Sequence, residues 1–200
     1  ARAKGVEAIL HLADALEEAG LPAGVFNLVF VPGAFSGAMA ADPRISAISF
    51  TGSTGVGRTL ARTCAEHGKR IQLEMGGKNP LVVLDDADLD RAVAIALDGS
   101  FLSSGQRCTA SSRLIVTDGI HDRFVAALSE AMGKLRVGHA LDPETRIGPV
   151  ASEDQRDTIE GFLNLVASER GQIVAGGERV SRPTEGYFLS PALLTGTSPA

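Results

Sequence analysis

The stretch that sets the fold is "ISAISFTGSTGVGRTLARTCAEHGKRIQLEM", residues 45–75. Residues 45–50 and 69–75 alternate apolar with polar positions and predict two strands. Between them, glycines mark a turn and helical spacing indicates a helix over about 55–67. Two strands joined through a helix form a parallel pair. Strands continue to alternate with helices along the chain, which predicts an α/β protein with a largely parallel, doubly wound sheet.

Further elements follow from periodicity and turn signals. Ser152, with Gln155 three residues later, is expected to begin a helix. A change in composition near "MGGKNP", residues 75–80, is the best candidate for a boundary between two domains. The other expected elements are helices at 3–19, 37–42, 86–102, 121–135 and 152–169, and strands at 25–31, 80–85, 113–117, 171–177 and 187–196.

Composition excludes several classes of protein. The 200 residues carry a net charge of −5, which argues against a nucleic-acid partner. No apolar run approaches the roughly 20 residues that cross a bilayer. Two cysteines in different settings, with no visible secretory signal, favour a reducing cytoplasm. The chain starts inside a helical pattern without an initiator Met, so we expect it to be the middle of a longer protein.

Three stretches are candidates for chemistry, and the first is the glycine-rich turn at 49–60. A strand that ends in such a turn before a helix leaves free N–H groups, which favour a phosphate. Thr54 stands where G-x-G-x-x-G needs its middle glycine, so that fingerprint is absent. Alternatively, the glycines only let the helix pack closely on the strand.

The second stretch is "LEMGGKNP", residues 73–80. Glu74 lies at the end of an expected strand between Leu73 and Met75, where loss of hydration would favour a neutral carboxyl and a general base. Alternatively, Glu74 faces outward together with Gln72, because both occupy the same face of an alternating strand.

The third stretch is "SSGQRCTASS", residues 103–112, in which Cys108 has small and polar neighbours. A thiolate is the attacking form of cysteine, and the positive charge of Arg107 would favour it. A structural thiol is the alternative. Cys64, in mid-helix near Leu60, is expected to pack in a core. No histidine has partners at metal-ligand spacing, so no metal site is assigned.

Taken together and in this order, "FTGSTGVGR", "LEMGGKNP" and "GQRCTA" resemble the cofactor loop, the general-base motif and the nucleophile motif of the NAD(P)-dependent aldehyde dehydrogenase superfamily. The similarity extends over nearly all of the chain. It implies that residues 1–76 are the C-terminal part of a Rossmann-like cofactor domain and that residues 77–200 are most of an α/β catalytic domain. The cofactor is expected to be NAD or NADP.

The resemblance also implies roles for single residues. Cys108 would attack the aldehyde, its backbone N–H would hold part of the oxyanion, and Glu74 would activate water to hydrolyse the thioester. Family residues that lie upstream (an oxyanion-hole Asn and a ribose-binding Lys) and downstream (Glu-x-Phe-Gly-Pro) are missing, so this chain alone is expected to be inactive. Cofactor contacts are expected from Gly37, Gly52, Ser53, Thr54, Gly55, Val56 and Gly57.

The substrate and the rival functions remain open. "GQRCTASSRLIV" looks most like dehydrogenases of 2,5-dioxopentanoate (α-ketoglutaric semialdehyde), and Arg107 would favour an acidic substrate by its charge. Rivals are a CoA-acylating semialdehyde dehydrogenase, which usually lacks the base, a Cys-dependent acyltransferase or hydrolase, and a non-catalytic binding module. The expected partners are a small aldehyde and further copies of the chain, as a homodimer or homotetramer, without nucleic acid or membrane.

Overall fold

The computed structural model describes residues 6–197. The chain divides into two compact units, Ala1–Gly76 and Gly77–Ala200. The roles expected for these two parts, in cofactor binding and in catalysis, stay predictions. Within the described residues, no helix combines the length and the apolar character that a membrane crossing requires.

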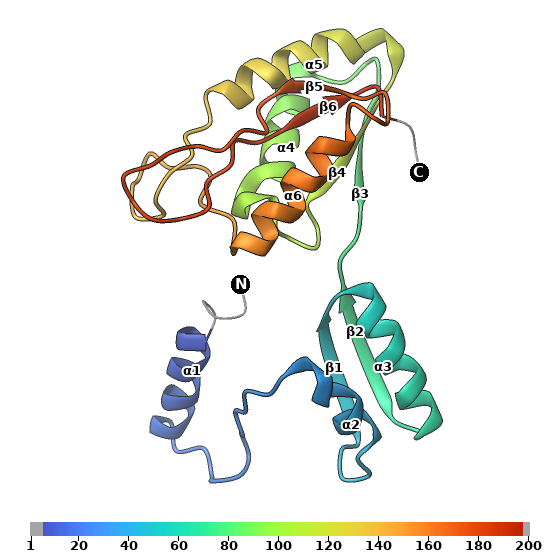
Figure 1. Cartoon of the computed structure of the whole chain (residues 1–200), viewed down its shortest axis with the longest axis vertical. Helices are drawn as coiled ribbons and strands as arrows, with labels where there is room; N and C mark the ends of the chain where they lie inside the picture. Colours follow the sequence, from blue (N-terminus) through green and yellow to red (C-terminus); the bar gives the residue numbers. More distant parts are fainter. Residues whose placement is uncertain (1–5, 198–200) are drawn as a thin grey trace. The chain divides into compact units, whose positions relative to one another are not determined.

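The first unit contains the parallel pair expected from residues 45–75. Strands β1 (Ala47–Gly52) and β2 (Arg70–Met75) lie side by side and are joined through helix α3 (Thr54–Glu66) (Figure 1). Leu60 and Cys64 of α3 are buried against the inner face of this pair, and Ala40 of the short helix α2 (Ser36–Ala41) completes the cluster. The packing role expected for Cys64 is confirmed, because its side chain is fully buried.

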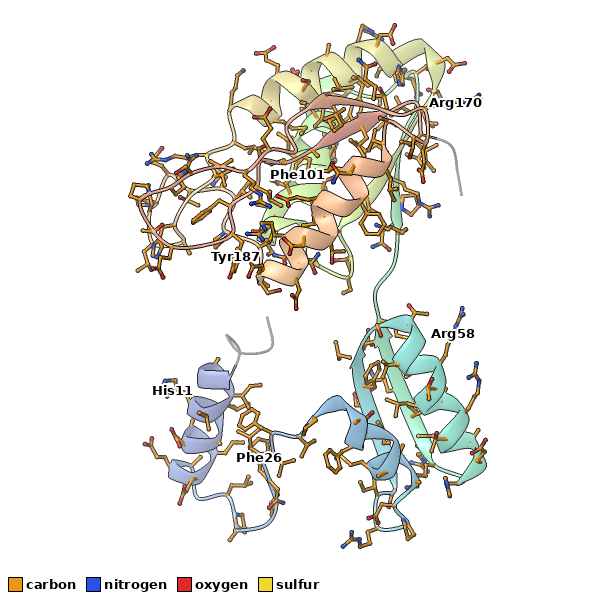
Figure 2. The ribbon with its side chains drawn as sticks, in the orientation of Figure 1. His11, Phe26, Arg58, Phe101, Arg170 and Tyr187 are labelled. Carbon is orange, nitrogen blue, oxygen red and sulfur yellow. The ribbon has the colours of Figure 1, made fainter. Side chains whose placement is uncertain are left out.

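Helix α1 (Val6–Glu18) forms as expected, although residues 3–5 of the expected helix lie outside the described part. The strand expected after it, at residues 25–31, is wrong. Residues 25–31, which include the labelled Phe26 of Figure 2, form no strand and precede the short η1 (Gly33–Phe35). Val29 is 63% exposed and Phe30 58%. A strand needs a hydrogen-bonded neighbour, and among residues 6–197 no strand pairs with this segment.

The second unit repeats the strand–helix–strand order. Strands β3 (Asn79–Val83) and β4 (Ser111–Val116) pair in parallel and are joined by α4 (Leu89–Phe101) and the short η2 (Leu102–Gly105). Asp88 caps α4 by accepting a hydrogen bond from the Arg91 N–H at 3.0 Å. Helix α5 (Asp118–Gly133) packs beside α4. The core between these elements contains Val83, Val93, Ala96, Ile120, Phe124, Leu128, Met132 and Leu193.

The end of the chain adds helix α6 (Glu153–Leu165) and an antiparallel pair, β5 (Gln172–Ala175) with β6 (Leu193–Thr195). The expected cap of α6 is confirmed, because Ser152 Oγ accepts a hydrogen bond from the Gln155 N–H at 3.2 Å. The α/β class with parallel strand pairs is therefore confirmed. The expected single doubly wound sheet is not seen, because the described strands form three two-stranded sheets, two parallel and one antiparallel.

Two side-chain contacts join α6 to the loop that leads to β6. Arg179 donates to Glu160, which lowers the pKa of that carboxyl, and the Arg156 guanidinium lies 5.3 Å from the ring centre of Tyr187 (labelled in Figure 2). Phe101, at the end of α4, packs against the core of the second unit and against a second buried cluster of Val137, Ile147 and Phe188.

Replacing Leu128 by Ala should lower the free energy of unfolding of the second unit by about 2–5 kcal/mol, because the side chain is fully buried and the change leaves a cavity. Urea denaturation followed by circular dichroism measures this loss. The matched control is Leu141→Ala, where the side chain is 86% exposed. Equal losses in the two variants would contradict this description of the core.

Candidate active site

The glycine-rich turn of the first unit ends β1 and begins α3. Ser53 is the N-cap of α3, and its Oγ accepts a hydrogen bond from the Val56 N–H at 3.4 Å. The N–H groups of Thr54 and Gly55 come before the intrahelical ladder and, in the described part of the chain, have no acceptor. Free N–H groups and the positive end of the helix dipole suit a phosphate.

The space beside each glycine of this turn differs. A Cβ on Gly57 would lie 2.5 Å from Met75 Sδ, and one on Gly52 would lie 2.5 Å from the Phe50 ring. Both positions therefore serve close packing, as the alternative interpretation held. A Cβ on Gly55 would meet nothing within 4 Å. Packing thus leaves Gly55 unexplained, and the open space beside it fits an approaching ligand.

Two further expected contacts of the cofactor lie on neighbouring helices of the same unit. Val56, in the first turn of α3, is 43% exposed, although it is apolar. Gly37 lies in the exposed first turn of α2, which packs on α3 through Ala40. An exposed apolar side chain beside free N–H groups fits a nucleotide, whose base is flat and whose phosphates are anionic.

Glu74 lies at the same edge of the sheet as this turn. The register of the parallel pair places Glu74 beside Thr51, at the carboxyl ends of β2 and β1. Ligands of open parallel sheets bind at that edge. The Glu74 side chain is exposed and accepts a hydrogen bond from Gln72 Nε2 at 3.3 Å. It therefore shares an outward face with Gln72, and the first unit alone does not bury its carboxylate.

Cys108 lies in a tight turn of the second unit, directly before β4. Its side chain is exposed and its thiol is free. The Ala110 N–H donates to the Arg107 carbonyl at 3.1 Å and closes the turn around Cys108 and Thr109. Within residues 6–197, the Cys108 N–H has no hydrogen-bond acceptor. The thiol and one donor are therefore both accessible at this turn.

The backbone that leads into the turn is strained. Ser103 and Ser104 have φ values of 57° and 56°, followed by Gly105 at 65°. Non-glycine residues in this left-handed region cost of order 1–3 kcal/mol each and persist only where other contacts hold them. Here Ser104 Oγ donates to the Gly148 carbonyl at 2.9 Å, and Gln106 Oε1 accepts from the Ala151 N–H at 3.1 Å.

Arg107 is also held by the backbone. Its Nη2 donates to the carbonyls of Asp98 and Gly99 at 2.8 and 3.2 Å, in the last turn of α4. A cation at a helix C-terminus satisfies free carbonyls and complements the dipole. Arg107 therefore anchors the cysteine turn to α4, and its expected contact with a substrate stays a prediction.

Asn79, the first residue of β3, contacts the cysteine turn directly through its side chain. Its Nδ2 donates to the Cys108 carbonyl at 2.7 Å and to the Ala110 carbonyl at 3.2 Å. The parallel ladder is irregular here: Asn79 pairs with Ser111 and Pro80 with Arg113, which leaves Ser112 as an extra residue. Such bulges redirect side chains and are frequent near active sites.

The structure thus brings the expected site residues together in two groups. Glu74 lies with the glycine-rich turn in the first unit, and Cys108 lies with Arg107 in the second. The convergence of Glu74 and Cys108 on one site stays a prediction. Sequence reasoning missed Asn79, Ser104 and Gln106. The available signal for Asn79 was its place inside the quoted motif "GGKNP", directly before a proline that begins a strand.

Comparisons with known proteins cover nearly the whole of this chain. The family model described as "Aldehyde dehydrogenase family" matches residues 3–200. A betaine aldehyde dehydrogenase of Cereibacter sphaeroides is 39% identical over 191 residues, which are 96% of this chain and 39% of that protein. An α-ketoglutaric semialdehyde dehydrogenase of Bacillus subtilis is 41% identical over 181 residues, which are 89% of this chain and 37% of that protein.

A solved structure is also similar to this chain over most of its length. A betaine aldehyde dehydrogenase of Staphylococcus aureus, in complex with NAD⁺, matches with a TM-score of 0.90 and 34% sequence identity. The match covers 95% of this chain and 38% of that chain. The chain therefore spans about two fifths of the length of the proteins that it resembles.

Proposed function

Because the chain belongs to the aldehyde dehydrogenase family, we propose that it supplies the nucleophile and the general base of an NAD(P)⁺-dependent oxidation of an aldehyde to a carboxylate. The observation that carries this proposal is the cysteine turn. An exposed thiol and a free backbone N–H lie side by side on a strained loop, which is held by hydrogen bonds from several elements.

The chemistry follows from these groups. The Cys108 thiolate adds to the aldehyde carbon, and the electron pair of the C=O π bond moves to the oxygen. The Cys108 N–H donates to that oxyanion, which gives a thiohemiacetal on sulfur. NAD(P)⁺, when bound, supplies the hydride acceptor that turns this species into a thioester. Glu74 then takes a proton from water, the hydroxide adds to the thioester carbon, and the C–S bond breaks, which releases the carboxylic acid and restores the Cys108 thiolate.

The cofactor would be held by the first unit. The free N–H groups of Thr54 and Gly55 and the hydroxyl of Ser53 suit its diphosphate, and Val56 suits the face of its base. Gly37, Gly52 and Gly57 belong to the same expected contact set. We propose accordingly that residues 1–76 are part of a cofactor domain and residues 77–200 most of a catalytic domain, in a cytoplasmic homodimer or homotetramer.

We also propose an acidic semialdehyde, such as 2,5-dioxopentanoate, as the substrate. Support comes from the Bacillus subtilis relative, named for that activity, and from the positive charge of Arg107 next to the nucleophile. The Cereibacter sphaeroides relative, named for a cationic aldehyde, is similar at nearly the same level. The physical argument is therefore the charge at position 107, which attracts a carboxylate and repels a quaternary ammonium group.

In a full-length enzyme that contains this segment, Glu74→Gln should keep a burst of NAD(P)H but lower steady-state turnover by about 10²-fold or more, because only thioester hydrolysis needs the base. Cys108→Ala should abolish both phases. Stopped-flow absorbance measures burst and turnover, with Glu66→Gln and Cys64→Ala as matched controls. Unchanged turnover in Glu74→Gln would refute the assignment, and product formed only with CoA would favour the CoA-acylating rival.

Ser53→Asp should separate a phosphate site from a simple helix cap. Aspartate caps helices as well as serine does, so the thermal midpoint should not fall. Its carboxylate would repel the diphosphate, so the dissociation constant of NAD(P)⁺ should rise at least about tenfold. Calorimetric titration of the full-length enzyme measures this. Ser152→Asp, the same change at the cap of α6, should leave binding unaltered, and wild-type affinity in Ser53→Asp would contradict the site.

A substrate panel tests the proposed specificity. We expect kcat/KM for 2,5-dioxopentanoate to exceed that for betaine aldehyde at least about tenfold, since a single charge interaction near a protein surface is worth 1 kcal/mol or more. NAD⁺ and NADP⁺ should be assayed in parallel. Equal or higher kcat/KM for betaine aldehyde would contradict the semialdehyde assignment and leave the proposed reaction type intact.

A further inference from the structure

Asn79 joins the end of the general-base motif to the nucleophile turn. Its amide donates to two carbonyls of that turn, at Cys108 and Ala110. Directly before it, the Lys78 carbonyl accepts hydrogen bonds from Arg113 of β4 at 3.1 Å (Nε) and 2.6 Å (Nη2). Arg113 therefore fixes the backbone at the start of β3, and the Asn79 side chain transfers this fixed position to the cysteine turn.

The two hydrogen bonds of Asn79 act on the turn in a defined way. The peptide between Arg107 and Cys108 is trans, so its N–H points opposite to its C=O. That C=O points into the turn, toward the Ala110 N–H. The Cys108 N–H therefore points out of the turn. Asn79 holds the carbonyls of Cys108 and Ala110, which fixes the next peptides and keeps the turn closed.

We propose that Asn79 is a positioning residue for the nucleophile: its amide holds the Cys108–Ala110 turn so that the Cys108 N–H and the thiol face the same aldehyde. This inference rests on the proposed function. In the addition step, the S–C bond forms, the C=O π bond breaks and the negative charge moves from sulfur to oxygen. Asn79 touches none of these atoms and acts only through the backbone of the turn.

If Asn79 had only a structural role, its replacement would loosen a larger part of the β3–β4 pair. The β3–β4 ladder continues from Pro80 to Val83, and the Thr117 N–H donates to the Val83 carbonyl at 3.0 Å, at the far end of the pair. If Asn79 only supported the sheet, its loss would weaken this far end together with the turn. If it positions the nucleophile, the turn alone should loosen.

Amide hydrogen exchange on the 200-residue chain separates the two roles. We expect Asn79→Leu, of similar size but without donors, to raise exchange at Ala110 at least tenfold and to leave Thr117 within about twofold of wild type. Asn79→Asp, which is isosteric and replaces the donor by an acceptor, should do the same. Asn27→Leu is the matched control, since the Asn27 amide donates to the Gly24 carbonyl at 2.9 Å in the first unit.

Kinetics in a full-length enzyme that contains this segment complete the test. Asn79→Leu should slow the burst of NAD(P)H at least tenfold, with the dissociation constant of NAD(P)⁺ within about twofold of wild type. Loss of one oxyanion donor costs about 10²–10³ in rate, so a misdirected donor should lower the burst rate measurably.

Four outcomes would overturn the inference: wild-type exchange at Ala110, equally raised exchange at Thr117, an unchanged burst rate, or loss of cooperative unfolding in both Asn79 variants. A wild-type enzyme that reduces neither NAD⁺ nor NADP⁺ would instead refute the proposed function. The exchange data would still decide whether Asn79 holds the turn.

Discussion

Parallel pairing of β3 with β4 is the constraint on which the candidate site depends. Two parallel strands begin at the same edge of a sheet, so the residues that precede them become neighbours. Here "GGK" of one motif precedes β3, Asn79 begins that strand, and the cysteine turn precedes β4. Helix α4 makes the crossover and offers its last carbonyls to Arg107. One strand pair thus explains why Asn79, Arg107 and Cys108 meet, although they are far apart in sequence.

The two units use opposite ends of the same strand–helix–strand arrangement. In the first unit, the candidate site residues lie at the carboxyl ends of β1 and β2. The N-terminus of α3 leaves N–H donors free there, and Glu74 lies at the same edge. In the second unit, they lie where β3 and β4 begin. A helix N-terminus suits an anion, whereas a strained loop tied to its neighbours suits a nucleophile that must not move. This difference is consistent with the proposed roles of the first unit in cofactor binding and of the second unit in catalysis.

Much of this could be predicted from local sequence, because the relevant interactions are local. Ser152 caps α6, Cys64 packs in mid-helix, and the 49–60 stretch forms strand, turn and helix as expected. The failures are all long-range. Residues 25–31 read as a strand but have no ladder partner among the described residues. Arg107 bonds to α4, and Ser103 and Ser104 adopt positive φ, which serine seldom does. The motif "GGKNP" marks the position of Asn79, but the identity of its hydrogen-bond partners about 30 residues away has no local signal.

The central claim is that the carboxylate of Glu74 and the thiol of Cys108 act on one aldehyde. A crystal structure of a full-length enzyme that contains this segment, with NAD(P)⁺ bound, tests it most directly through the position of Glu74 relative to Cys108 Sγ. The account predicts that both side chains line one cavity, with room for a water molecule between the carboxylate and the carbon bound to sulfur. A Glu74 side chain on an outer surface, with no cavity leading to the thiol, would contradict it.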